Sequence, residues 1–167
     1  MDAGHSIYVH AMKYLFRLLC LCLPLLTSCD MGDDEQEWSL PVGSALPHFI
    51  VTTDDGRTIT EEDFIGRTGI IVFFNTVCSD CRRELPLLQQ AYNDSLSAGS
   101  DALFLCIARE ETAPVIREYW EREGLTLPFS PQSDRRVYNL FANLGIPRIF
   151  VTATEGRVRQ SLTDWPR

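Results

Sequence analysis

The sequence predicts an α/β fold, and three observations carry that prediction. Two nearly unbroken apolar runs, residues 69–76 and 102–108, have the composition of strands that are buried on both faces. Each run is followed by a segment whose apolar residues recur at helical spacing. The order strand, helix, strand, helix is that of a βαβ crossover, which is right-handed in almost all proteins.

The elements before the first buried run predict a β-hairpin. Residues 47–64 read PHFIVTTDDGRTITEEDF, which contains a strand, an Asp-Asp-Gly turn and a short second strand. Thr60 is followed three residues later by Asp63, and this pair predicts a cap on one helical turn. The strand at residues 69–76 comes next.

The elements after this strand are predicted from spacing and end signals. A helix is expected from Cys81 to about Leu96, followed by the second buried strand. The next helix, over residues 112–124, has a capping threonine, a proline in its first turn and a glycine at its end. Residues 134–145, DRRVYNLFANLG, predict a further helix. Residues 147–162 predict a hairpin with its turn at 154–156.

The N-terminus predicts a signal peptide over residues 1–28, which is not part of the fold. Residues 14–26 are apolar apart from Arg17, and they are too few for a membrane span but have the length of a signal-peptide core. Lys13 and Arg17 supply the basic region. Met12 is a more conventional start than the first residue.

The end of this segment, LTSC at residues 26–29, resembles the lipobox of bacterial lipoproteins, in which the cysteine becomes the lipidated first residue. The alternative is a plain secretory peptide cleaved near Ser28. We favour lipidation of Cys29, because an exposed unpaired thiol is a liability in an oxidising compartment. Residues 29–39 then form an acidic tether, residues 40–167 form the domain, and a bacterial membrane anchors the protein on its periplasmic side or at the cell surface.

Length and charge limit the remaining possibilities. The 167 residues fit one domain with appendages, and the apolar fraction of 45% allows a sizeable core. The net charge of -8 argues against a nucleic-acid partner, because phosphate contacts need a basic face.

The stretch NTVCSDCRRELP places two cysteines directly after the first buried strand. A zinc site needs four ligands, and only Cys106 and His48 remain as further candidates after processing, so no metal is expected. A structural disulfide is disfavoured, because a loop of two residues hardly restricts the unfolded chain. Redox exchange needs an exposed thiolate at a helix N-terminus and a second thiol close behind it. Cys78 is therefore the predicted nucleophile and Cys81 the resolving thiol.

With these residues, and with GIPRIFV at 145–151, residues 41–162 resemble thioredoxin-fold proteins of the TlpA/ResA-like group of redoxins. The resemblance implies a central mixed sheet flanked by helices, with the N-terminal hairpin as an extension. Pro86, five residues after the second cysteine, stands where thioredoxins place a helix-kinking proline. Ile146 and Pro147 match the substrate-binding loop that carries the family's cis-proline, the alternative for Pro147 being a simple turn.

The chain departs from the family at several positions. Val77 replaces the tryptophan that usually precedes the first cysteine, and Arg148 stands where a threonine is frequent. Glu84 matches an acid of ResA-like proteins and is either a relay for the proton of the resolving thiol or a surface charge. The five residues after Leu162 are too few for the family's C-terminal helix. We therefore expect that helix to be missing or shortened, or another element to cover its face of the sheet.

The first functional hypothesis is a thiol–disulfide oxidoreductase that acts on exported cysteine-containing proteins. The resemblance implies regeneration by a membrane electron donor of the thioredoxin-reducing type, with no cofactor besides the Cys78–Cys81 disulfide. The second hypothesis is a thiol peroxidase, although Ile71 and Asn75 replace the proline and threonine of the pattern Pro-x-x-x-Thr-x-x-Cys. The third is a non-catalytic binding module.

The residues between the cysteines, Ser79 and Asp80, are expected to tune the redox couple. A carboxylate beside Cys78 opposes formation of the thiolate, which favours the disulfide and lowers the reduction potential. Arg82, Arg83 and the helix terminus act in the opposite direction. We expect the Cys78–Cys81 couple to have a low reduction potential, so that the protein acts more readily as a reductant than as an oxidant.

Overall fold

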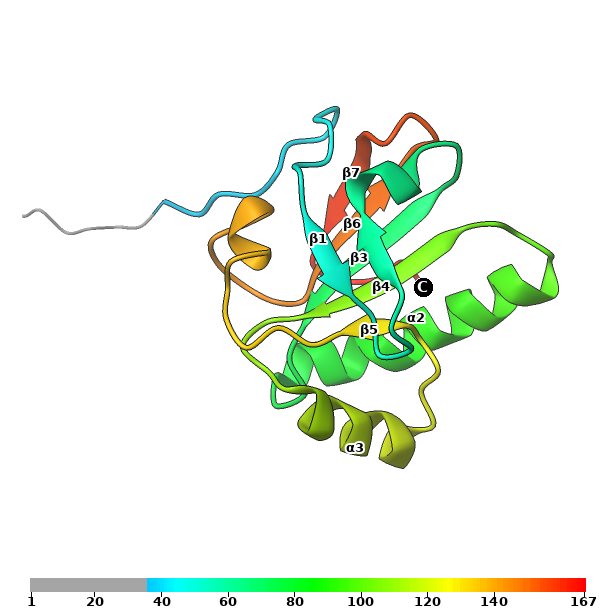
Figure 1. The fold of residues 1–167 in the computed structure, drawn as a ribbon, viewed down its shortest axis with the longest axis vertical. Coiled ribbons are helices and arrows are strands. Elements are labelled where there is room, and N and C mark those ends of the chain that lie inside the picture. The colour runs from blue at the N-terminus through cyan, green and yellow to red at the C-terminus, as the bar shows by residue number, and fades with distance from the viewer. Residues whose placement is uncertain (1–35) are drawn as a thin grey trace, which may run out of the picture. The chain divides into compact units, whose positions relative to one another are not determined.

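The computed structural model describes residues 36–167, and its central sheet confirms the predicted α/β fold. The predicted signal peptide and Cys29 lie outside the described residues. A mixed sheet has the strand order β5-β4-β3-β6-β7 (Figure 1). Strands β3, β4 and β5 are parallel, whereas β6 is antiparallel to β3 and to β7. The bounds are Gly69–Phe74 for β3, Leu103–Ala108 for β4, Phe129–Ser130 for β5, Arg148–Thr152 for β6 and Val158–Leu162 for β7.

The central strand β3 is buried along its whole length. It pairs with β4 on one side and β6 on the other, so its backbone is hydrogen-bonded at both edges. Alternate side chains point to opposite faces of a sheet. Val72 and Phe74 therefore enter one core, and Ile71 and Phe73 enter the other. This placement explains why β3 contains no polar residue.

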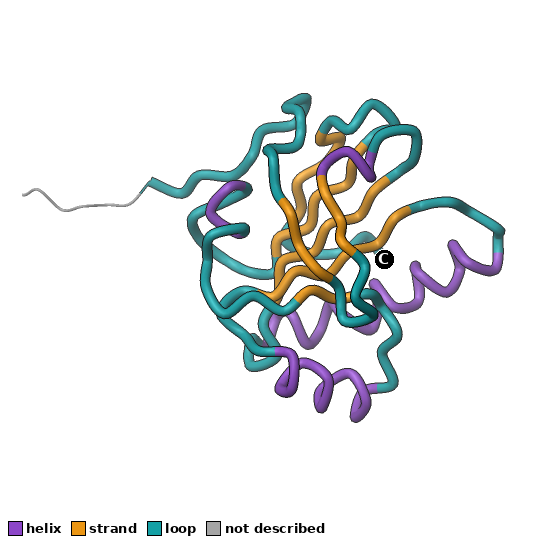
Figure 2. The backbone as a smooth tube through the Cα atoms, in the orientation of Figure 1, coloured by secondary structure: helices purple, strands orange, loops and turns teal. Residues whose placement is uncertain are grey.

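Two helices cover one face of the sheet (Figure 2). Helix α2 (Ser79–Ser97) follows β3, and helix α3 (Ala113–Glu123) follows β4. Thr112 is the N-cap residue of α3, and Gly124 ends it with a φ of 66°, a left-handed conformation that glycine adopts without strain. The buried side chains between these helices and the sheet, which include Cys81, Leu85, Ile116 and Trp120, are called the helix-side core here.

The other face is covered by the predicted N-terminal hairpin and by the segment before β6. Strand β1 (Ile50–Thr52) pairs with β2 (Thr58–Thr60), and the chain continues into the 3-10 helix η2 (Glu61–Phe64). The Thr60 amide donates to the Asp63 carboxylate at 2.8 Å, which is the predicted cap. The hairpin lies where the sequence places it.

Phe73 lies at the centre of an aromatic cluster on this second face. Its ring centroid is 4.9 Å from that of Phe141, 5.4 Å from Tyr138 and 6.2 Å from Phe150. All four side chains are buried. Tilted and edge-to-face pairs of this kind stabilise a core beyond the area they bury.

The helix predicted over residues 134–145 is wrong. The structure has only the 3-10 helix η3 (Tyr138–Leu140) in this segment. Tyr138 and Phe141 do face the core, which accounts for their helical spacing. The backbone that follows pairs instead with residues 38–40, and Asn143 donates to the Trp38 carbonyl at 3.1 Å. A long-range pairing therefore takes the place of further helical hydrogen bonds.

After β7 the described chain continues as an irregular segment, residues 163–167, and not as a helix. Trp165 in this segment is partly buried and packs against the helix-side core. A short irregular segment therefore covers part of the face on which the family's C-terminal helix was expected.

Residues 36–167 contain no helix that is both long and apolar enough to span a bilayer. Within the same residues, His, Cys, Asp and Glu side chains form no group of three or more that is placed to hold a metal ion.

Candidate active site

The first cysteine of the pair caps the helix that follows it. Cys78 is the N-cap residue of α2, and its Sγ atom accepts a hydrogen bond from the Cys81 amide at 3.3 Å. The Cys78 side chain is partly exposed. This thiol is therefore partly reachable from solvent and lies at the N-terminus of the helix.

The second cysteine lies one turn into α2 and is fully buried. Burial raises the pKa of the Cys81 thiol, and the hydrogen bond with Cys78 raises this pKa further. Both thiols are free in this structure. The pair is therefore asymmetric: the exposed thiol can attack a substrate, whereas the buried one needs a base to remove its proton.

The turn between β3 and α2 is held by residues that follow β4 and by an arginine of α2. The Thr76 amide and hydroxyl donate to the two oxygens of the buried Glu111 carboxylate at 2.9 and 2.5 Å. The Asn75 side chain donates to the Arg109 carbonyl at 3.1 Å, and Arg82 Nε donates to the Thr76 carbonyl at 2.5 Å. These bonds fix the backbone just before the first cysteine.

The loop before β6 lies against Cys78. The Ile146–Pro147 peptide bond is cis. The Cys78 thiol donates to the Ile146 carbonyl, with a distance of 3.5 Å from sulfur to oxygen. The Tyr138 hydroxyl donates to the Gly145 carbonyl at 2.7 Å, so a member of the aromatic cluster holds this loop in place.

Arg148, at a position where the family often has threonine, holds the same loop from its other end. Its side chain is buried, and its Nε donates to the Leu144 carbonyl at 3.2 Å. The guanidinium group also forms an ion pair with Glu37. This departure from the family therefore ties the N-terminal segment to the loop.

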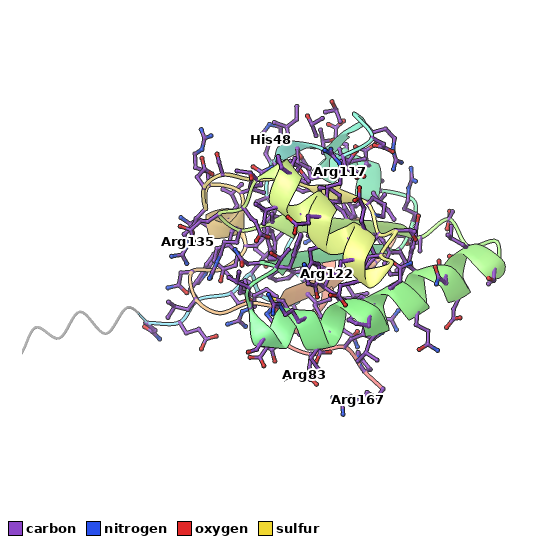
Figure 3. The ribbon with its side chains drawn as sticks, turned by 90° about the horizontal axis from the view of Figure 1, so that it is seen from below. His48, Arg83, Arg117, Arg122, Arg135 and Arg167 are labelled. Carbon is purple, nitrogen blue, oxygen red and sulfur yellow. The ribbon has the colours of Figure 1, made fainter. Side chains whose placement is uncertain are left out.

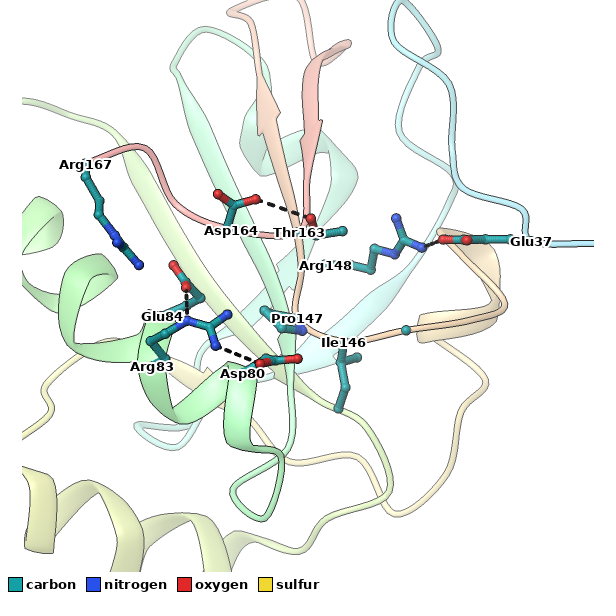
Figure 4. Close-up of a pocket in the computed structure, with 11 residues that line it drawn as sticks. Glu37, Asp80, Arg83, Glu84, Ile146, Pro147, Arg148, Thr163, Asp164 and Arg167 are labelled. Atoms are coloured by element: carbon teal, nitrogen blue, oxygen red, sulfur yellow. Dashed lines mark hydrogen bonds and ion pairs between the residues drawn. The ribbon is translucent and has the colours of Figure 1, made fainter.

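Charged side chains of the first turns of α2 form a connected row (Figure 4). Arg83 donates to Asp80 at 2.8 Å and to Glu84 at 3.0 Å. The Asp80 side chain is 56% exposed, whereas that of Glu84 is 1% exposed. The burial of Glu84 contradicts its alternative interpretation as a surface charge. The Glu84 carboxylate therefore lies buried in α2, one helical turn from Cys81.

A groove of about 450 Å³ opens beside these residues. Asp80 and Glu84 line it on one side, and Ile146 and Pro147 line it on the other (Figure 4). Arg83 and Arg167, both of which line this groove, lie at the same edge of the molecule when it is viewed from below (Figure 3).

The structure brings most of the predicted site residues together, and Cys29 lies outside its described part. Sequence reasoning missed Glu111. Its position just after the second buried strand was a usable signal, because adjacent parallel strands end at the same edge of a sheet. It also missed Trp165, for which the sequence holds no signal. The residues that lie together are Cys78, Ser79, Asp80, Cys81, Glu84, Ile146 and Pro147.

Several bacterial relatives named as thiol–disulfide oxidoreductases are similar to this chain. It is 24% identical over 153 residues to the thiol-disulfide oxidoreductase ResA of Bacillus thuringiensis subsp. konkukian (strain 97-27), a match that covers 90% of this chain and 87% of the relative. It is 24% identical over 125 residues to ResA of Bacillus subtilis (strain 168), which covers 75% and 69% of the two chains.

Solved structures agree with this comparison. A thiol:disulfide interchange protein of the thioredoxin family from Chlorobium tepidum TLS superposes with a TM-score of 0.63 at 27% identity, over 77% of this chain and 90% of that one. A thio-disulfide isomerase from Thermus thermophilus gives a TM-score of 0.61 at 25% identity, over 77% and 89%. The fold is thus that of thioredoxin-like proteins, as the sequence resemblance implies.

A family model spans the same region. It matches residues 42–161, which contain the hairpin, both cysteines of the pair and the loop with the cis peptide bond. Since this match covers most of the chain, the chain belongs to the AhpC/TSA family.

Proposed function

We propose that this chain is a thiol–disulfide oxidoreductase in which Cys78 is the nucleophile and Cys81 the resolving thiol. The asymmetry of the pair carries this proposal: a partly exposed thiol caps α2, and a buried thiol lies one turn behind it. The thiol–disulfide oxidoreductases among the relatives support the same activity.

The proposed cycle has two exchange steps. In the first, the Cys78 thiolate attacks one sulfur of a substrate disulfide, the substrate S–S bond breaks, and the other sulfur leaves as a thiolate that takes a proton from water. In the second, Cys81 loses its proton and attacks Cys78 Sγ. The Cys78–Cys81 bond forms and the second substrate thiol is released. Two electrons pass from the enzyme dithiol to the substrate, and the cycle uses neither a metal nor an organic cofactor.

The substrate is proposed to be an exported cysteine-containing protein that lies extended along the Ile146–Pro147 loop. The contact between Cys78 and the Ile146 carbonyl supports this placement. Lipidation at Cys29 would hold the protein on a bacterial membrane, facing the periplasm or the cell surface, and a membrane electron donor would restore the dithiol. The sequence pattern of residues 1–29 and the resemblance to ResA-like proteins support this part.

Asp80→His is expected to raise the reduction potential of the Cys78–Cys81 couple by about 30 mV, which is tenfold in its equilibrium constant. The substitution removes a carboxylate that opposes the Cys78 thiolate, and it leaves Arg83 paired with Glu84 alone. Equilibration with glutathione buffers, followed by alkylation of free thiols and mass measurement, gives the potential.

Asp94→His is the matched control, because Asp94 is also exposed on α2 but lies far along the helix from the cysteines. Its potential is expected to equal that of the unchanged protein. A reduction potential that stays the same or falls in the Asp80→His variant would show that Asp80 does not lower the potential of the Cys78–Cys81 couple.

Turnover of insulin disulfides by the full-length protein, with dithiothreitol as the electron donor, tests the proposed function. We expect reduction well above the rate with dithiothreitol alone, and a reaction with hydrogen peroxide no faster than that of an ordinary thiol. Rapid peroxide turnover with intact insulin would support the thiol peroxidase. A protein inert in both assays would support the non-catalytic binding module.

A further inference from the structure

The buried Glu84 carboxylate is held from two separate parts of the chain. Its Oε1 atom accepts from Arg83 Nε at 3.0 Å, within α2. Its Oε2 atom accepts from the backbone amide of Trp165 at 2.9 Å, and Trp165 lies 81 residues further along the chain. Both oxygens of the carboxylate therefore have a hydrogen-bond donor, one from the same helix and one from the end of the described chain.

The segment that supplies the second donor is anchored by its own side chain. The Trp165 indole packs against the helix-side core, which contains Cys81, and Cys78 packs against the same core. Thr163, Asp164 and Arg167 of this segment line the groove opposite the first turns of α2 (Figure 4). The segment thus lies over the Glu84 carboxylate, with its one large apolar side chain turned into the protein.

One donor would leave the carboxylate poorly fixed. Arg83 is 53% exposed, and it is shared with Asp80 on the surface. A carboxylate held at one oxygen can still turn about the bond to its carboxyl carbon. A rigid backbone amide from a different element fixes the other oxygen, and with it the plane of the group.

We propose that Trp165 is a positioning residue for the second exchange step, which it serves by holding Glu84 at the resolving thiol. This inference rests on the proposed function. The Glu84 carboxylate takes the proton from the Cys81 thiol. The Cys81 sulfur then attacks Cys78 Sγ, the bond from Cys78 to the substrate sulfur breaks, and the departing thiolate takes up a proton from water or from Glu84. Because Cys81 is buried, water does not replace this base at equal rate.

Trp165→Pro tests the amide directly, because proline has no backbone N–H. Reaction of the reduced, full-length protein, with Cys20, Cys22 and Cys29 replaced by serine, with an aromatic disulfide, 5,5'-dithiobis(2-nitrobenzoate), separates the two steps. Attack by Cys78 releases one coloured thiolate, and attack by Cys81 on the mixed disulfide releases the second. The variant should keep the first phase and slow the second roughly tenfold at neutral pH, the size expected for losing a hydrogen bond to a charged group. The variant should also need a higher pH than the unchanged protein to reach the same second-phase rate.

Two further variants separate positioning from packing. Trp165→Phe keeps the amide and an aromatic ring, so its second phase should remain close to that of the unchanged protein. In a Glu84→Gln background, Trp165→Pro should slow the second phase no further, because the two residues act through one another. Equal slowing with and without the Glu84 carboxylate would overturn the inference, since it would mean a purely structural role.

Hydrogen exchange gives a second readout that does not depend on folding of the proline variant. The Trp165 amide of the unchanged protein should be protected, and Glu84→Ala should speed its exchange about tenfold. An unprotected Trp165 amide, or a second phase in Trp165→Pro equal to that of the unchanged protein, would overturn the inference alone. Failure of the unchanged protein to form a mixed disulfide at all would overturn the proposed function, and this inference with it.

Discussion

Replacing Cys78 with serine is expected to reduce disulfide turnover by a factor on the order of a thousand or more, to the background rate. Cys81 cannot take over the attack, because its side chain is fully buried and burial raises its pKa. A protein disulfide does not reach it, and little of it is ionised at neutral pH. Insulin reduction by the full-length protein measures this loss.

Cys81→Ser should behave differently from Cys78→Ser. It keeps the exposed nucleophile, so it should attack once and then accumulate as a mixed disulfide with the substrate, visible as added mass under non-reducing conditions. Cys106→Ala is the matched control, because it removes the third thiol of residues 36–167, which is buried in β4 and is not part of the cysteine pair, and it should turn over normally. Substantial turnover by Cys78→Ser would contradict the assignment of the nucleophile.

Phe73→Ala is expected to lower the free energy of unfolding by about 3–5 kcal/mol. Phe73 is fully buried, and its ring contacts three other aromatic rings of the cluster. The substitution removes this apolar contact area and leaves a cavity that the rigid central strand cannot close. Because a domain of this size is stable by only about 5–15 kcal/mol, the loss is a large share of the total.

Urea unfolding measures this effect, provided that the slope of the unfolding free energy against urea concentration is the same in both proteins. Leu96→Ala is the control: it also removes a large apolar side chain, but Leu96 is 57% exposed on α2, and its loss should change stability by no more than about 0.5 kcal/mol. Since Tyr138 of the same cluster supports the loop before β6, Phe73→Ala should also weaken substrate reduction at temperatures where it is still folded. Equal stability of Phe73→Ala and the unchanged protein would contradict the described core.

Local patterns were enough to predict the part of the fold that bears the cysteines. The run from Gly69 is apolar because β3 is covered on both faces, and the helix after it begins at the first cysteine and shows its periodicity. Caps, turns and glycine stops act over a few residues, so the hairpin and α3 could also be predicted. Strand β5 could not, because two residues flanked by prolines carry no pattern.

The features that could not be predicted share a physical cause: each depends on a contact between residues that are far apart in the sequence. Residues 134–145 have helical spacing, but pairing with residues 38–40 decides their backbone. The Glu111 carboxylate binds Thr76 across 35 residues, and the Trp165 amide binds Glu84 across 81. No propensity of either partner signals such a bond. The identities of the reactive residues could be read from the sequence, whereas the groups that hold them in place could not.

The exposure of Ser79 and Asp80 has a consequence for how this protein can change. Both residues lie on the surface of the first turn of α2, whereas the bonds that hold the site come from residues on either side of them, from the segment after β4 and from the loop before β6. Substitutions at these two positions can therefore alter the electron affinity of the thiol pair with little effect on folding. Mutations at these positions can therefore change the reduction potential of the cysteine pair, while the positions of the two cysteines stay the same.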